Sequence, residues 1–290
     1  MISPYVRRRR LAAEITRLRD DHGYSADRLA RSIGVARQRI SRLENGHVRP
    51  DLDEIMRILA ELGVGQPRWN TIMAIARESQ ERGWWEKFAT QMGPRQALYA
   101  NLEAGASTIS EYQLTLLPGL LQIPTFTQAR ARVDHSAHGQ EFDRERAVEA
   151  RAARQQVMQR PGGPTYEVII DELAVRRLAA PGNVVCRQLD HLIDLGHNNS
   201  KITIRVLRVG ARIADHAVAR SPFSVYRYPD PDDPVVVAVD TVTSDLVLTD
   251  AAEVDYYLAL YDRLREAALA PLDSLDLLAA VAEELREKDR

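Results

Sequence analysis

The sequence predicts a mainly α N-terminal domain of four to five helices, followed by a larger α+β domain. The chain has 290 residues, more than one domain usually holds. Its first part shows apolar residues at helical spacing, whereas short β-branched runs alternate with helical patterns from residue 108 onward. We therefore expect domains at 1–68 and 108–290, joined by a helical connector at 69–107.

Apolar stripes and helix-end signals define the N-terminal helices. Ser25 and Asp51 are good N-caps, because their side-chain oxygens can accept the first unpaired backbone N–H groups of a helix. Gly23, Gly34 and the pair Asn45-Gly46 are typical helix stops. The predicted helices span 8–21, 26–33, 36–44 and 52–62.

The rest of the chain contains a mixture of elements. Residues 69–100 have a helical pattern, and for Trp84-Trp85 core packing is favoured over an aromatic ligand cage because adjacent helical residues point in different directions. The turn at Pro118-Gly119 follows the first strand. Further helices are predicted at 144–160, 184–197, 251–270 and 273–288, and strands at 109–116, 166–170, 201–208, 222–228 and 234–240.

The charge is unevenly distributed. Residues 1–50 hold 12 Arg, no Lys and 5 acidic residues, a balance of +7, so the remainder carries −9 to give the net charge of −2. Only the first segment therefore has the charge of a polyanion-binding protein. The single Cys186, the lack of a long apolar run and the absence of a leader pattern predict a cytoplasmic protein with no membrane span.

Small and apolar residues at 29–43 have the spacing of a helix-turn-helix. Two steeply crossing helices need a small residue at their contact, which Ala30 supplies, and a residue that tolerates positive φ in the turn, which Gly34 supplies. The core of this motif is predicted to contain Leu29, Ile33, Ile40 and Leu43.

The opposite side of the third helix is polar. A helical wheel places Ala36, Ile40 and Leu43 on one arc and leaves the other face to hydrogen-bonding side chains. Arginine can form a paired contact with guanine and glutamine with adenine, so this face has the chemistry for direct readout of DNA bases, although a plain solvated face would also be polar. The candidate base-contacting residues are Arg37, Gln38, Ser41 and Arg42.

Residues 8–64 resemble the XRE family of helix-turn-helix regulators. The resemblance is carried by Ser25-Ala26-Asp27-Arg28-Leu29-Ala30, Gly34-Val35 and Ile40-Ser41-Arg42-Leu43-Glu44-Asn45-Gly46. It implies a regulator of transcription that binds double-stranded DNA as a homodimer, and it departs from the family at Ala36, where a capping Ser or Thr is common. The residues expected to contact phosphates are Arg19, Ser25, Ala26, Arg39 and Arg49.

Most of residues 70–290 resembles the C-terminal domain of actinobacterial WhiJ-type, antitoxin-like regulators. The carriers are Leu117-Pro118-Gly119-Leu120-Leu121-Gln122, Arg151 through Gln156, Ile169-Ile170-Asp171-Glu172 and Ala268 through Ser274. Such regulators are often encoded beside a short partner protein. The resemblance therefore implies a domain for dimerisation and for control by a small protein or a small ligand, whose binding residues stay unknown.

Two other functions compete with this interpretation. An enzyme could use Asp171-Glu172 or the histidines, but His135 and His138 lack a carboxylate constellation, and no HExxH, GxSxG, P-loop or GxGxxG motif occurs. We therefore expect no enzymatic activity, no cofactor and no metal. The alternative is an antitoxin-like protein that sequesters a small partner protein and represses its own operon.

Overall fold

A computed structural model describes residues 2–135, 144–241 and 245–288. The chain forms two compact units, which we call the N-terminal unit and the C-terminal unit. The N-terminal unit comprises Met1–Glu86, Asn101–Gly105 and Tyr228–Pro234, and the C-terminal unit comprises Lys87–Ala100, Ala106–Arg227 and Val235–Arg290. The loop Tyr228–Pro234, far along the sequence, is thus part of the first unit.

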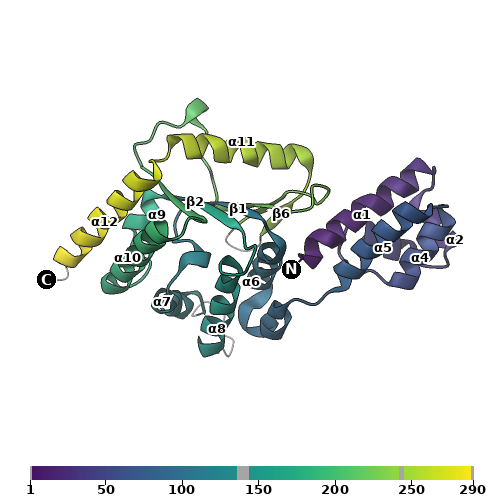
Figure 1. The fold of residues 1–290 in the computed structure, drawn as a ribbon, viewed down its shortest axis with the longest axis horizontal. Helices are drawn as coiled ribbons and strands as arrows, with labels where there is room; N and C mark the ends of the chain where they lie inside the picture. The colour runs from purple at the N-terminus through teal and green to yellow at the C-terminus, as the bar shows by residue number, and fades with distance from the viewer. Residues whose placement is uncertain (1, 136–143, 242–244, 289–290) are drawn as a thin grey trace. The chain divides into compact units, whose positions relative to one another are not determined.

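Five α-helices build the N-terminal unit (Figure 1). Ser25 and Asp51 cap α2 and α4 as predicted, each accepting a backbone N–H from three residues ahead. The first helix begins four residues before its predicted start, because Ser3 caps it and Pro4 suits its first turn. The helices are α1 (Pro4–Asp21), α2 (Ala26–Ser32), α3 (Arg37–Glu44), α4 (Leu52–Glu61) and α5 (Gln66–Gln80).

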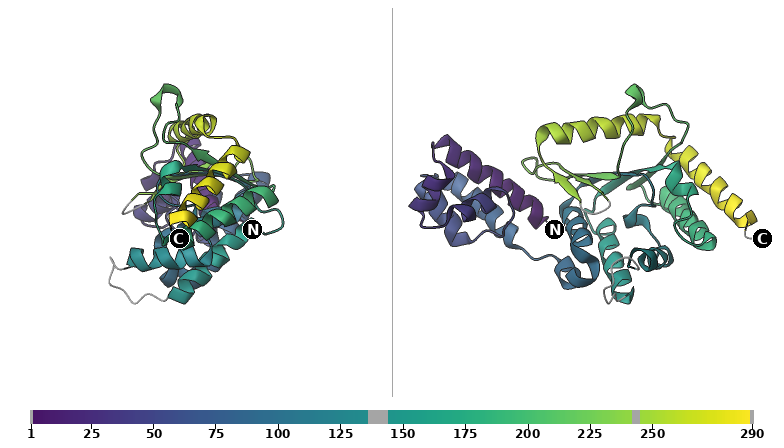
Figure 2. Two further views of the ribbon diagram at one scale, coloured as in Figure 1. Left: turned by 90° about the vertical axis from the view of Figure 1, so that its left-hand side faces the viewer. Right: turned by 180° about the vertical axis from the view of Figure 1, so that it is seen from behind.

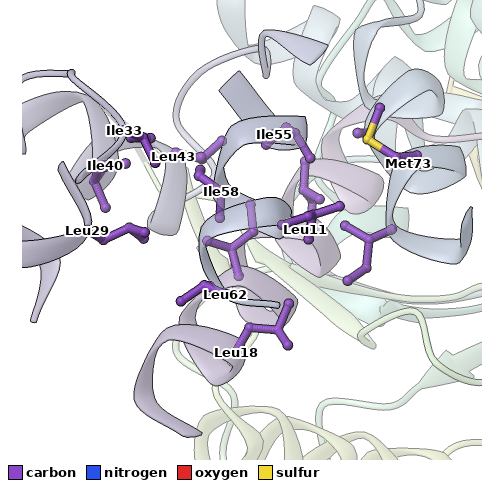
Figure 3. Packing of buried hydrophobic residues seen from close by; sticks show 14 of the residues in the cluster. Leu11, Leu18, Leu29, Ile33, Ile40, Leu43, Ile55, Ile58, Leu62 and Met73 are labelled. Atoms are coloured by element: carbon purple, nitrogen blue, oxygen red, sulfur yellow. The ribbon is translucent and has the colours of Figure 1, made fainter. Parts of the chain in front are cut away.

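A cluster of mainly aliphatic side chains forms a core among the helices of this unit (Figure 3). Leu11 and Leu18 of α1 pack in it with Ile55 and Ile58 of α4. Helix α5 adds further buried side chains, among them Met73. The predicted boundary at residue 68 falls within α5, so residues on both sides of it contribute to the same core.

Residues 69–100 are largely helical, but they do not form one continuous helix. Helix α5 ends at Gln80, and a 3-10 helix, η1 (Trp84–Phe88), precedes α6 (Ala89–Gly105). Helix α6 is itself kinked at Gly93, which has φ 69°, next to Pro94. Trp85 is buried, as the predicted core packing requires, whereas Trp84 is half-buried and meets the Trp85 ring edge to face.

The C-terminal unit contains a mixed six-stranded sheet in the order β3-β2-β1-β4-β5-β6, which confirms the α+β class. Strands β1, β2 and β3 are parallel, and the remaining neighbours are antiparallel. The three-residue strand β6 was not predicted. The strands are β1 (Thr108–Gln113), β2 (Thr165–Asp171), β3 (Ile202–Leu207), β4 (Phe223–Arg227), β5 (Val236–Val239) and β6 (Leu246–Leu248).

Helices cover both faces of this sheet (Figures 1 and 2). Helix α11 (Ala251–Ala267) packs on the face that presents Tyr112, Ile169 and Phe223. The opposite face is covered by α7 (Pro124–His135), α8 (Arg144–Gln155) and α10 (Gly182–Asn198), and α12 (Pro271–Lys288) packs along α10. Between β2 and α10 lies the short helix α9 (Glu172–Arg176), and the 3-10 helices are η2 (Gly119–Leu121), η3 (Gln156–Met158) and η4 (Ala214–His216).

Several predicted boundaries need correction. The helix predicted over 144–160 ends at Gln155 and is followed by η3, and α11 ends at Ala267, ahead of the predicted residue 270. Helix α7 was missed because its amphipathic pattern is weak. Its C-terminal residue His135 ends the described segment, and His138 lies outside the described residues.

Candidate nucleic-acid interface

The turn between α2 and α3 has the geometry that its sequence predicts. Ala30 is 2% exposed at the contact between the two helices. Gly34 takes φ +72°, a left-handed conformation that an L side chain rarely adopts. The backbone N–H of Val35 donates to the carbonyl of Ala30 at 2.9 Å, closing the C-terminus of α2. The two helices are thus fixed by local backbone chemistry.

A residue from α4 also supports this turn. Arg57 donates from Nη1 to the carbonyl oxygen of Ile33 at 2.7 Å, at the C-cap of α2. A cation near the C-terminus of a helix satisfies unpaired carbonyls and offsets the helix dipole. Sequence analysis did not find this residue, because the contact joins positions 24 residues apart.

Helix α3 has a buried side, whose Ile40 and Leu43 are labelled in Figure 3, and an exposed side. Ile40 and Leu43 are buried in the aliphatic core, as predicted. Ala36 is exposed: it is the N-cap residue and lies just before the helix, so its expected place on the buried arc is wrong. No side-chain cap hydrogen bond is present there, as the alanine implies. The exposed residues of α3 include all four candidate base contacts, Arg37, Gln38, Ser41 and Arg42.

The five candidate phosphate contacts differ in their surroundings. Arg19 is largely buried, and it donates from Nε to Glu44 at 2.5 Å and from Nη1 to the carbonyl of Tyr24 at 2.8 Å. Arg39 is half-buried and pairs with the buried Glu54 at 2.8 Å. Arg49 is exposed and forms an ion pair with Glu86. Arg19 and Arg39 therefore hold the helices together, whereas Arg49 is open to solvent.

The other two candidates lie at the N-terminus of α2. Ser25 is exposed, and its Oγ accepts the backbone N–H of Arg28 at 3.1 Å. Ala26, the first residue of the helix, is half-buried. Backbone N–H groups at a helix N-terminus favour an anion, so this end of α2 suits a phosphate.

The arginine tract at 7–10 lies within the fold of the N-terminal unit. Arg7 and Arg10 are both buried, and their Nη1 atoms contact Asp230 at 3.1 and 2.5 Å and Asp233 at 2.9 and 3.3 Å. Arg9 donates to the carbonyl oxygen of Asn45, the C-cap of α3, at 2.8 Å. These arginines therefore bind the protein's own carboxylates and carbonyl groups.

The position of the acidic loop Tyr228–Pro234 beside these arginines changes the pKa values of two of its carboxyl groups. Burial by itself would raise the pKa of Asp230, but hydrogen bonds from Arg10, the Asp232 backbone and Arg7 outweigh it and lower the pKa to about 2. Burial raises the pKa of Asp233 despite the nearby arginines. The buried Asp233 thus depends on both guanidinium groups to stay ionised.

The loop also changes the charge of the unit. The N-terminal unit holds 16 arginines, no lysine and 16 Asp and Glu residues, so it has no net charge. The +7 of residues 1–50 is therefore not the charge of the folded unit, and our inference from it needs correction. Because the whole unit is neutral, it can attract DNA only through a face on which positive charge predominates.

Comparison with known protein families now adds to the geometry. The family described as "Helix-turn-helix" matches residues 15–65, which include α2 and α3. The family described as "Domain of unknown function (DUF5753)" matches residues 96–280, well over half of the chain. The chain belongs to the DUF5753 family. Comparison with curated proteins and with solved structures gave no match.

The two matches cover different parts of this DUF5753 protein. The first shows an XRE-type helix-turn-helix, so the chain is a DNA-binding regulator. The second covers the mixed sheet and most of its helices. The finer resemblance to WhiJ-type, antitoxin-like regulators is not confirmed by either match and stays a prediction.

Two exposed arginines of α2 were not among the predicted DNA-contacting residues of this DUF5753 protein. Arg28 stacks on Tyr24, with its guanidinium carbon 3.9 Å from the ring centroid. Arg31 is exposed in the last turn of the same helix. Both could have been found from their helical position opposite Leu29 and Ala30.

Within 2–135, 144–241 and 245–288, no group of three or more His, Cys, Asp or Glu side chains could hold a metal ion. In the same part of the chain, no helix is long and apolar enough to cross a membrane. Cys186 is buried, the core position expected for it.

Proposed function

We propose that this chain is a sequence-specific transcriptional regulator that inserts α3 into the major groove of DNA. The observation that carries the proposal is the division of α3 into a buried side and an exposed side formed by Arg37, Gln38, Ser41 and Arg42. Three of these four side chains can contact two groups of one base edge or bridge neighbouring bases. Regulators of this motif use the N-terminal part of the second helix in this way.

The exposed surroundings of α3 support phosphate contacts. Arg28 and Arg31 are exposed on α2, and the exposed Arg49 follows α3 in the chain. Arg37 lies 3.3 Å from Asp27, but both side chains are more than half exposed, so this ion pair is weak and can be exchanged for DNA. In the proposed complex α3 contacts bases, while these arginines and the N-terminus of α2 contact phosphates.

A selection of DNA fragments by the full-length protein tests base recognition. Arg42→Ala should weaken binding to the preferred site by about 1–3 kcal/mol and relax the preference at one base pair. Arg77→Ala is the matched control, because Arg77 is an exposed arginine on α5. An unchanged base preference in Arg37→Ala, Gln38→Ala and Arg42→Ala alike would show that α3 is not the recognition helix.

The proposal includes a homodimer in the cytoplasm, with control through the DUF5753 domain and no catalytic role for that domain. A single helix-turn-helix contacts only a few base pairs, and dimers gain specificity by placing two recognition helices about 34 Å apart. Sedimentation of the full-length protein bound to its operator should show two chains per DNA site. The operator itself should contain two half-sites one helical turn apart. One chain on an asymmetric site would contradict the dimer.

A further inference from the structure

A polar cavity of about 170 Å³ lies within the C-terminal unit. Its walls come from α6, β1 and the turn after it, α7, α8, β4 and the end of β5. The cavity therefore lies where helices from distant parts of the chain meet one edge of the sheet. No sequence pattern indicates which residues of this domain bind an effector.

Positive charge predominates in the lining. Four arginines, Arg95, Arg130, Arg151 and Arg154, line the cavity, against the two carboxylates of Glu111 and Asp240. Arginine side chains bind carboxylate and phosphate groups through parallel N–H donors, and a cavity with low-dielectric walls strengthens such contacts. This composition favours an anionic ligand.

The two carboxylates already have partners in the wall. Asp240 lies 3.0 Å from Nη1 of Arg95. Glu111 accepts the hydroxyl of Tyr166 at 2.5 Å and also the side-chain amide of Gln113. Arg95 and these two carboxylates lie in one part of the wall, and the other three arginines of the lining come from α7 and α8.

The backbone at Gly119 makes room for one of these arginines. A Cβ atom at this position would lie 2.5 Å from Nη1 of Arg151, so any side chain here would require the Arg151 guanidinium to shift. The turn is held from α8, since Gln155 donates to the carbonyl oxygen of Gln122 at 2.7 Å. Gly119 therefore lets the guanidinium of Arg151 lie directly against the chain at the cavity wall.

The second arginine of α8 is held in a fixed position. Arg154 is 8% exposed, donates to Gln96 at 2.6 Å, and lies with its guanidinium carbon 5.3 Å from the centroid of the Tyr99 ring. Burial raises the pKa of Tyr99, and the nearby Asp245 and Asp240 raise it further, so its phenol stays protonated. A protonated phenol beside a guanidinium adds a hydrogen-bond donor to the cavity.

We propose that this cavity binds a small ligand with a carboxylate or phosphate group, held by Arg151 and Arg154, and that it is the effector site of the DUF5753 domain. The volume is close to that of a cavity that holds benzene, so the ligand has roughly ten non-hydrogen atoms or fewer. The effector role rests on the proposed regulatory function, whereas binding of the anion does not. An effector that prefers one state of the protein changes operator affinity, and operator DNA changes effector affinity by the same factor.

Equilibrium dialysis of the full-length protein tests the site directly, with radiolabelled inorganic phosphate and radiolabelled succinate as probes. At least one probe should bind saturably below about 10 mM, with about one site per chain. Arg151→Gln should weaken that binding by roughly tenfold, the worth of one charge-assisted hydrogen bond. Gly119→Ala should weaken it as well, because the new methyl group displaces the Arg151 guanidinium while the backbone keeps its conformation.

Two control variants distinguish the cavity from general charge and glycine effects. Arg187→Gln removes an exposed arginine of α10, and Gly210→Ala adds a methyl group where no atom lies within 4 Å. Both should bind the probe like the unaltered protein. Saturable binding of phosphate alone, or of succinate alone, identifies which oxyanion the site prefers.

The absence of saturable binding for both probes, or equal loss in all four variants, would overturn the site. Operator affinity is then measured with and without the probe that binds. A changed affinity supports the effector role, and an unchanged affinity overturns that role while leaving the anion site in place. Failure to bind any DNA would instead contradict the proposed regulator, so the two failures are distinguishable.

Discussion

Gly34 and its neighbours show how single residues determine the geometry of α2 and α3. A residue in the left-handed region lets the chain reverse sharply, and Ala30 lets the two helices approach closely. Adjacent positions on α3 then take opposite roles, since Ile40 is buried and Ser41 is exposed. These features were predictable, because they depend on residue type and helical spacing alone.

Gly34→Ala should destabilise the N-terminal unit by about 1–2 kcal/mol, because alanine is strained at φ +72° although no atom lies within 4 Å of its Cβ. Gly34→Asn should destabilise the unit less, since asparagine tolerates this conformation. All three tryptophans belong to this unit, so urea unfolding followed by tryptophan fluorescence measures its stability. Equal stability of Gly34→Ala and the unaltered protein would contradict a strained turn.

Among elements, the contact between α1 and the loop Tyr228–Pro234 differs most from the sequence interpretation. A run of four arginines near a helix-turn-helix suggests DNA contact, but Arg7 and Arg10 pair with carboxylates more than 200 residues away. Sequence spacing cannot show such a pairing, because it depends on the tertiary path of the chain. The exposed face of α3 was therefore predictable from its sequence, whereas the partners of the arginine tract on α1 were not.

Asp233→Asn should destabilise the N-terminal unit by about 2 kcal/mol, because it leaves Arg7 and Arg10 short of a buried counter-charge. Asp232→Asn is the matched control. Asp232 lies in the same loop and pairs with Arg10, but its side chain is 77% exposed. Asp232→Asn should therefore lower the free energy of unfolding by no more than about 0.5 kcal/mol. The same urea titration measures both, and similar losses would mean that burial does not govern this network.

At the scale of the whole molecule, features that depend on local sequence were predictable, whereas features that depend on contacts between distant segments were not. Long helices such as α10 and α12 and the buried strand β2 follow from periodicity and could be located within a few residues. The strand order β3-β2-β1-β4-β5-β6 could not, because pairing joins segments that are distant in sequence. The division into units has the same origin, since a loop between β4 and β5 belongs to the N-terminal unit.

The neutral charge of the N-terminal unit leads to a prediction for DNA binding by the full-length protein. Each phosphate contact contributes about −0.9 to the slope of log K against log salt. Arg49→Ala should reduce that slope by about 1, because Arg49 is exposed beside α3. Arg9→Ala should leave it unchanged, since Arg9 is bound to the C-cap of α3.

Fluorescence anisotropy with a selected operator, repeated over a range of salt concentrations, measures these slopes. Arg77→Ala again provides the control for removing one exposed arginine. If the arginine tract of α1 lay along the DNA backbone, Arg9→Ala would lower the slope as much as Arg49→Ala does. That result would show that the arginine tract contributes positive charge to DNA binding. It would contradict a purely structural role for the tract. The expected difference between these two variants arises because a charge attracts DNA only when it lies on the face that meets the phosphates.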